Sequence, residues 1–165
     1  MKQFTRSSWV IFTLLLLTLV PWSQTLPSLE FQTKETQSRA TTTWSGNVWL
    51  NSSYHVSSSD SLIITDCTHI WMATNTRIVV DGRLTIQGTT SCPVILHSQG
   101  LGDHDGIQFN SSSRSRGSVI DNLTIEDAEY GITIYNSNPS LNSVHIENAD
   151  FVAIDLFNSA SPIIR

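Results

Sequence analysis

The segment between Gly100 and Gly106 is the part of the sequence best suited to chemistry. It places Asp103, His104 and Asp105 next to one another between glycines, in a stretch whose composition predicts an inserted loop. Two carboxylates that flank an imidazole can transfer a proton or bind a metal ion. A turn rich in Asp and Gly has the same composition for backbone reasons alone, and we favour the turn. The three residues are therefore weak catalytic candidates, and no metal site is predicted.

A second group of carboxylates recurs at a fixed interval. Glu126 and Glu147 occupy equivalent positions in two segments that repeat, so they lie one above the other in any fold that stacks its repeats. Carboxylates this close either bind Ca²⁺ or form a solvated corner with mild repulsion. We favour the corner, because no Arg or Lys base stands beside the pair in the repeat. No cofactor is therefore expected, and Ca²⁺ is the one candidate.

Aromatic residues supply the remaining binding candidates. Tyr54, Trp71 and Tyr130 lie on short segments where a ring can stack on a sugar or pack against neighbouring side chains, and packing is the commoner role. Glu126, Glu147 and Tyr130 are the predicted binding residues, and a glycan or cell-surface polymer is the expected partner.

The elements that must position these residues repeat along the chain. Ile120–Ala128 matches Leu141–Ala149 at an offset of 21, and Gly131–Ser137 matches Ala153–Ser159 at an offset of 22. Short strands of alternating apolar and polar residues fall into three columns. The first column holds 48–50, 70–72, 94–96, 123–125 and 144–146; the second holds 54–56, 78–80, 107–109, 132–134 and 154–156; the third holds 62–64, 84–86, 120, 141 and 163.

This pattern predicts an all-β protein, a right-handed parallel β-helix over residues 47–165. It has about five coils of 21–29 residues with three short strands each, and residues 26–46 form a lead-in or cap. A leucine-rich repeat is the competing solenoid, but it needs a helix or similar turn where this sequence is rich in β-branched residues, Asn and Pro. A β-sandwich is the other alternative, but it does not require the sequence to repeat, so the repeat favours the β-helix.

The two cysteines fall at nearly equivalent places in neighbouring coils. Cys67 precedes the strand 70–72 by three residues, and Cys92 precedes the strand 94–96 by two. The two Cα atoms are therefore expected about one strand spacing apart, ~4.8 Å, plus a small offset. A disulfide needs roughly 4.4–6.8 Å, so we favour a disulfide over two buried thiols.

The N-terminus has the layout of a secretory signal peptide. Lys2 and Arg6 precede an uncharged run, Trp9–Val20, which Pro21 ends. The run is too short to span a bilayer. We predict a signal peptide over residues 1–25, cleaved after Thr25, and hence a secreted or cell-surface protein; an uncleaved anchor is the alternative. The sequence has no second apolar run, so no other membrane span is predicted.

The charge of the chain argues against two classes of partner. The formal net charge is −5, and no stripe of Lys and Arg occurs. Binding to nucleic acid needs clustered cations that neutralise phosphates, and docking on anionic lipid needs the same. Neither partner is therefore expected.

A family resemblance rests on three motifs, RIVVDGRLTIQGT at 77–89, PVILHS at 93–98 and HDGIQF at 104–109. They resemble the entry coil of secreted right-handed β-helix repeat proteins with the pectin-lyase-like fold, whose third motif usually carries a Trp that is absent here. Members of that family include adhesins, surface-layer proteins and carbohydrate-active enzymes, and the motifs specify fold rather than function.

The resemblance and the residues together favour a non-catalytic secreted or cell-surface module, structural or binding glycan. The alternative is the N-terminal part of a polysaccharide lyase or glycoside hydrolase. A carboxylate pair with an Arg or Lys on one exposed face would favour the enzyme, and the sequence reveals none. The pattern runs unchanged to Arg165, which predicts that the solenoid continues in a longer protein.

Overall fold

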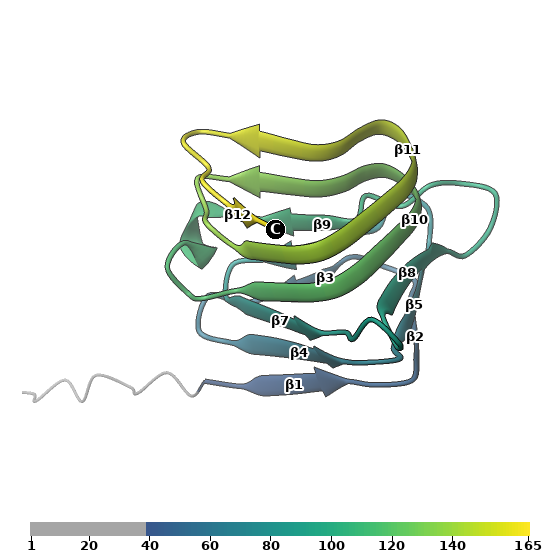
Figure 1. Ribbon diagram of the computed structural model, residues 1–165, viewed down its shortest axis with the longest axis horizontal. Coiled ribbons are helices and arrows are strands. Elements are labelled where there is room, and N and C mark those ends of the chain that lie inside the picture. Colours follow the sequence, from purple (N-terminus) through teal and green to yellow (C-terminus); the bar gives the residue numbers. More distant parts are fainter. Residues whose placement is uncertain (1–38) are drawn as a thin grey trace, which may run out of the picture. The chain divides into compact units, whose positions relative to one another are not determined.

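A computed structural model describes residues 39–165, which form a parallel β-solenoid of about six turns (Figure 1). The predicted parallel β-helix is thereby confirmed, while the right-handed sense of the coil stays a prediction. The predicted signal peptide and residues 26–38 of the predicted lead-in lie outside the described residues. No helix among residues 39–165 is long and apolar enough to cross a membrane.

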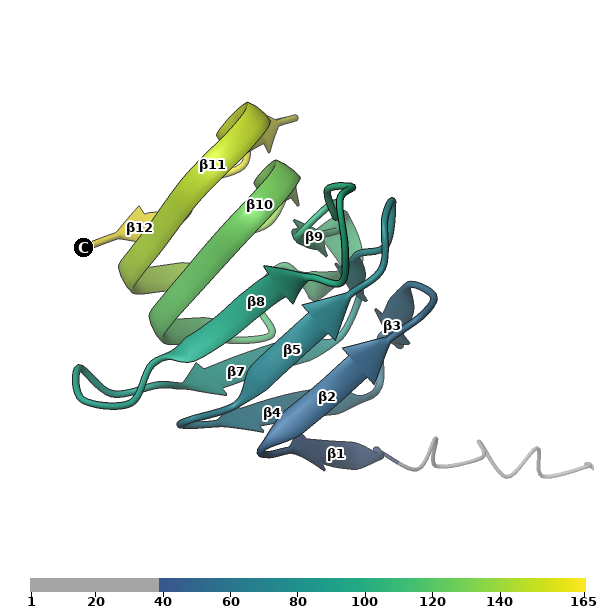
Figure 2. The ribbon, with the colours of Figure 1, turned by 90° about the vertical axis from the view of Figure 1, so that its right-hand side faces the viewer.

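The strands stack in the three predicted columns, because each coil pairs in parallel with the next. Figure 2 faces the first column. That column holds β2 (Asn47–Leu50), β5 (His69–Met72) and β8 (Val94–Ser98); the second holds β3 (Tyr54–Val56), β6 (Ile78–Val80) and β9 (Ile107–Phe109); the third holds β1 (Thr41–Trp44), β4 (Ser61–Thr65), β7 (Arg83–Gln87) and β12 (Ile163–Ile164). The long strands β10 (Val119–Tyr135) and β11 (Ser140–Phe157) pass through all three columns, and one 3₁₀ turn, η1, spans Ser111–Ser113.

β10 and β11 turn their corners at residues that adopt left-handed backbone angles. Asn122 and Asp127 in β10 have φ of 48° and 54°, and Ser143 and Asn148 in β11 have φ of 52° and 55°. Asn and Asp tolerate this region better than most side chains. The side-chain amide of Asn148 also donates to the Asp127 carboxylate at 3.1 Å, so the equivalent corners of the two coils are joined.

The register of β10 and β11 is the one that the repeat predicts. Leu123 pairs with Val144, and Ile132 pairs with Ile154. The register shifts between Ala128 and Tyr130, where β11 carries one more residue than β10. This β-bulge explains why the repeat offset rises from 21 to 22 along the chain.

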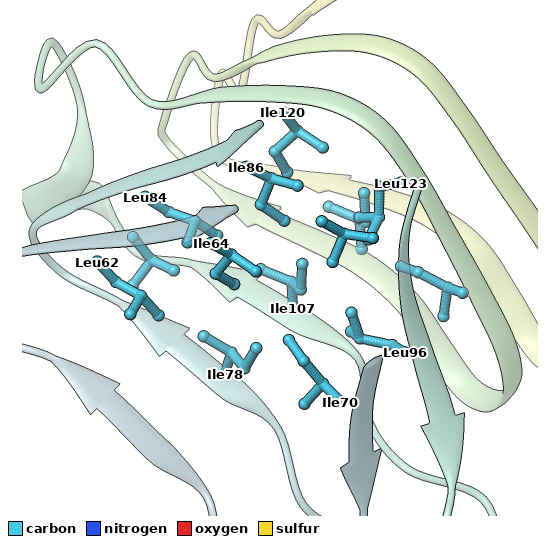
Figure 3. Packing of buried hydrophobic residues seen from close by; sticks show 14 of the residues in the cluster. Leu62, Ile64, Ile70, Ile78, Leu84, Ile86, Leu96, Ile107, Ile120 and Leu123 are labelled. Carbon is cyan, nitrogen blue, oxygen red and sulfur yellow. The ribbon is translucent and has the colours of Figure 1, made fainter. Parts of the chain in front are cut away.

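Inward side chains of the three columns make one apolar core (Figure 3). Leu123 and Ile125 of β10 are 1% and 0% exposed, and they stack on Val94 and Leu96 of the preceding coil. The equivalent Val144 and Ile146 of β11 are only partly buried, although they pack against the core. Burial of such side chains is the main stabilising contribution in a coil of this kind.

The solenoid has one more turn than the five predicted, because β1 pairs with β4 in the third column. β1 lies inside the range 26–46 that the sequence suggests as a lead-in. Three of its four side chains are exposed, and only Trp44 packs against the core. A strand that reads Thr-Thr-Thr-Trp lacks the apolar alternation by which the other strands were recognised.

Candidate ligand-binding groove

A groove of about 320 Å³ lies on the outer face of the second column, over β9, β10 and β11. Its lining divides into four aromatic side chains and a polar set. The aromatic residues are Tyr130, Tyr135, Phe151 and Phe157, and the polar residues are Arg77, Asp105, Gln108, Thr133 and Asp155. This combination of apolar rings with a few polar groups is typical of sites for small organic ligands.

The aromatic residues form two pairs, one toward each end of the second-column strand segments. Tyr135 and Phe157 are in register in adjacent coils, and their rings stack with centroids 4.8 Å apart and planes 11° apart. Tyr130 and Phe151 meet at 5.2 Å with planes tilted by 53°. The two tyrosines are five positions apart in the extended chain of β10, which corresponds to roughly 16 Å.

Phe151 reaches the groove because of the bulge in β11. Glu129 alone separates Ala128 from Tyr130, whereas two residues of β11 lie opposite it, and Phe151 is one of them. The ring is 69% exposed, and that of Phe157 is 39% exposed. Large apolar rings that remain in contact with water around a concavity are typical of binding surfaces.

The polar floor follows from the stacking of outward side chains. Gln108, Thr133 and Asp155 are in register in three successive coils, so they form a row along the solenoid between the aromatic pairs. Arg77 donates to the Gln108 side-chain oxygen at 2.7 Å and forms an ion pair with Asp105. Asp105 is 7% exposed, and Arg77 is its ion-pair partner.

Within the described part of the chain, Asp155 differs from Asp105 because it takes part in no ion pair. Among residues 39–165, the ion pairs involve other carboxylates, those of Asp81, Asp105, Glu126 and Glu147. Since Arg77 is engaged by Asp105, the groove carries one net negative charge, at Asp155.

The three catalytic candidates of the Gly100–Gly106 loop are directed to different places. His104 points inward and is fully buried. Its Nδ1 accepts a hydrogen bond from the Gly106 N–H at 3.0 Å, so its Nε2 carries the proton and donates to the Glu126 carbonyl at 3.1 Å. Burial lowers the pKa of His104 despite the opposing effect of that carbonyl. A neutral imidazole with both nitrogens satisfied is a structural group here.

Asp103 belongs to an acidic corner and does not itself line the groove. A hydrogen bond with Asp150 raises the pKa of Asp103, and desolvation and the nearby charges of Asp150, Asp127 and Glu129 act in the same direction. Among residues 39–165, no group of three or more His, Cys, Asp and Glu residues is arranged to hold a metal ion. Asp105 is thus the one member of the predicted trio that lines the groove.

Of the three predicted binding residues, Tyr130 alone lines the groove. Glu126 and Glu147 are in register, as the repeat predicts, but both follow the first column. Glu126 accepts a hydrogen bond from Nδ1 of His97 at 2.8 Å.

The other two aromatic candidates pack against neighbours. Trp71 stacks on the His97 ring at 4.2 Å. Tyr54 packs edge-on against Trp44 at 4.7 Å. Tyr54 and Trp44 also pack against the apolar core, and neither Tyr54 nor Trp71 lines the groove.

Cys67 and Cys92 face each other at the corner between the third and first columns. Their Cα atoms are 4.8 Å apart and their sulfur atoms are bonded. The Cys67 N–H also donates to the Cys92 carbonyl at 3.3 Å. The disulfide thus links two successive coils and closes a loop of 25 residues.

Seven groove residues were not predicted from the sequence: Arg77, Gln108, Thr133, Tyr135, Phe151, Asp155 and Phe157. A signal existed for one pair, because Tyr135 and Phe157 occupy equivalent positions of the repeat. Arg77 and Asp155 carry no such signal, since they stand three coils apart on outward positions that the core does not constrain. In comparisons with protein-family models, with curated proteins and with solved structures, nothing matched this chain.

Proposed function

We propose that the chain is a non-catalytic glycan-binding module, secreted or held at a cell surface, and that its glycan lies in the groove of the second column. The observation that carries the proposal is the pairing of two aromatic walls with a row of hydrogen-bonding groups, all on one face.

The chemistry of a sugar fits such a lining. A pyranose ring has apolar C–H faces, which pack on aromatic rings, and a rim of hydroxyls, which need donors and acceptors. Tyr135 and Phe157 supply the aromatic rings, and the hydrogen-bonding groups come from Gln108, Thr133 and Asp155. The row of polar groups runs along the solenoid, so a short glycan would lie across successive coils.

Export is supported by the sequence and by one covalent feature. The apolar run Trp9–Val20 has the layout of a signal peptide. The bond between Cys67 and Cys92 would persist in an oxidising compartment outside the cytosol. A cell-surface glycan is therefore a partner that the mature chain would meet.

The test is binding of soluble oligosaccharides by the purified protein, measured by calorimetry after a screen on a glycan array. Tyr135→Ala and Phe157→Ala should each weaken binding about tenfold or more, because each removes half of one aromatic wall. Trp49→Ala is the matched control, since Trp49 is 61% exposed and does not line the groove. Binding that falls equally in all three variants, or no binding to any glycan, would contradict the proposal.

Glycan cleavage is the second candidate, because the groove holds two carboxylates and an arginine. Asp105, Asp155 and Arg77 together are the combination that the sequence alone did not reveal. Binding is favoured over cleavage because Asp105 and Arg77 are occupied by each other, which leaves Asp155 without a second free group. Turnover of polygalacturonate or alginate that disappears in Asp155→Asn would establish the enzyme instead.

A further inference from the structure

We propose that the groove selects saccharides that carry a protonated amine, such as oligomers of glucosamine, and that Asp155 makes the selection. This inference rests on the proposed function and names its ligand class. This ligand class differs from the acidic glycans that Arg- or Lys-rich grooves bind, because this groove carries net negative charge.

The first step is the charge of the lining. Arg77 is the one cation among the lining residues, and its guanidinium is already engaged by the Asp105 carboxylate and the Gln108 side chain. No positive charge is left for a uronate. Asp155 keeps a carboxylate that no Arg or His of the described chain neutralises.

The second step is the position of that carboxylate. Asp155 is the last residue of the row that begins at Gln108 and Thr133, and it precedes Phe157 by two residues in β11. Residues two apart in a strand point to the same face. The carboxylate therefore lies beside the Tyr135–Phe157 stack.

The third step is the chemistry of that combination. Aromatic faces attract cations through the ring quadrupole, and a nearby carboxylate adds a direct ion pair. An ammonium group between the two gains both interactions, whereas a neutral acetamide gains neither. The same carboxylate repels a uronate.

The surroundings act in the same direction. The acidic corner formed by Asp103, Asp127, Glu129 and Asp150 adjoins Tyr130 and Phe151 in the chain. The whole chain carries a formal charge of −5. Long-range attraction of a cationic oligosaccharide is therefore expected at low ionic strength.

The experiment compares three probes of equal length by calorimetry, at a pH where the amine is protonated. The probes are the β-1,4-linked glucosamine tetramer, its fully N-acetylated form and tetragalacturonate. The amine tetramer should bind about tenfold more tightly than the acetylated one, and tetragalacturonate should not bind measurably. In Asp155→Asn the difference between the first two should shrink to about twofold, whereas Asp155→Glu should keep the preference.

The matched control is Asp66→Asn, which makes the same change of charge at an exposed residue outside the groove lining. It should leave the preference unchanged. A control that loses the preference as much as Asp155→Asn would overturn the inference, because the attraction would then come from overall charge.

The result also separates the inference from the function on which it rests. Equal affinity of the wild type for the amine and acetylated tetramers would overturn the amine preference and leave glycan binding standing. Absence of binding to every glycan would contradict both. If Asp155→Asn does not fold, the wild type decides: the preference must fall as salt rises, and a preference that salt does not change would overturn the inference.

Discussion

Replacement of Ile125 by Ala tests the register of the whole solenoid. Ile125 is 0% exposed and stacks between Leu96 of the preceding coil and Ile146 of the following one. If the register is right, its side chain fills the core between two coils that the parallel backbone hydrogen bonds hold in place. The change removes three carbon atoms from that space.

The expected loss of stability has two contributions. Transfer of three buried carbons back to water costs ~2.4 kcal/mol, at about 0.8 kcal/mol for each. A cavity adds to this, because the neighbouring coils cannot move together while their strands remain paired. We therefore expect the free energy of unfolding to fall by about 3–4 kcal/mol, within the ~2–5 kcal/mol observed for such changes.

Urea denaturation followed by circular dichroism and by tryptophan fluorescence measures this loss. The two probes must give the same transition, because solenoids do not always unfold in one step. Ile146→Ala is the matched control: it is the same substitution one coil later, at a partly buried position. It should cost roughly half as much. A loss below about 0.5 kcal/mol for Ile125→Ala would show that the side chain is exposed and refute the register.

Three further predictions concern the corners of the coil. Gly106→Ala should lower the free energy of unfolding by at least about 2 kcal/mol, because Gly106 has φ of +58° and an added Cβ would meet the Gly131 carbonyl. Gly46→Ala is the control: Gly46 has φ of +70° but open space around it, so the loss in the same denaturation assay should be about 1 kcal/mol. The lowered pKa of His104 means that the unfolded chain takes up a proton below pH ~6.5 that the folded chain does not, so the stability should be fully present above that pH and fall toward pH 5. The variant His104→Gln should flatten this pH dependence in thermal melts. A slope that stays unchanged in the variant would contradict a buried neutral imidazole. Thiol titration of denatured, non-reduced protein should find no free thiol, and Cys67→Ser with Cys92→Ser should cost about 3 kcal/mol; two thiols per chain would disprove the bond.

The stacking of the coils could be predicted from the sequence because parallel pairing requires equal spacing. Ile125 and Ile146 must be the same distance from their corners if both are to face the core, so the repeat encodes the register of β10 and β11 directly. β1 could not be predicted from the sequence, because its Thr41–Thr43 side chains are exposed and form no apolar pattern.

The candidate site could be predicted only in part, because the core does not constrain outward side chains. Tyr130 was found as an aromatic residue near a corner, and Asp105 as part of a loop. The contact of Arg77 with Asp105 joins residues 28 apart in sequence, and nothing in either segment indicates that the other lies beside it. His104 is only a weak catalytic candidate on sequence alone, because an Asp- and Gly-rich turn has the same composition as a catalytic loop, and the burial of its imidazole is visible only in the structure.

A regular solenoid does not produce a groove, because identical coils place equivalent side chains in flat rows. Here the flat row is the floor of the groove and consists of Gln108, Thr133 and Asp155. The rims of the groove come from positions where the solenoid is irregular. The extra residue of β11 directs Phe151 toward Tyr130, and all four aromatic residues of the groove belong to β10 and β11. Sequence changes at the bulge should therefore alter ligand binding with little effect on the core, whereas changes at inward positions should alter stability with little effect on the ligand. If the groove is the binding site that we propose, one coil pattern specifies the fold while its irregular positions specify the ligand.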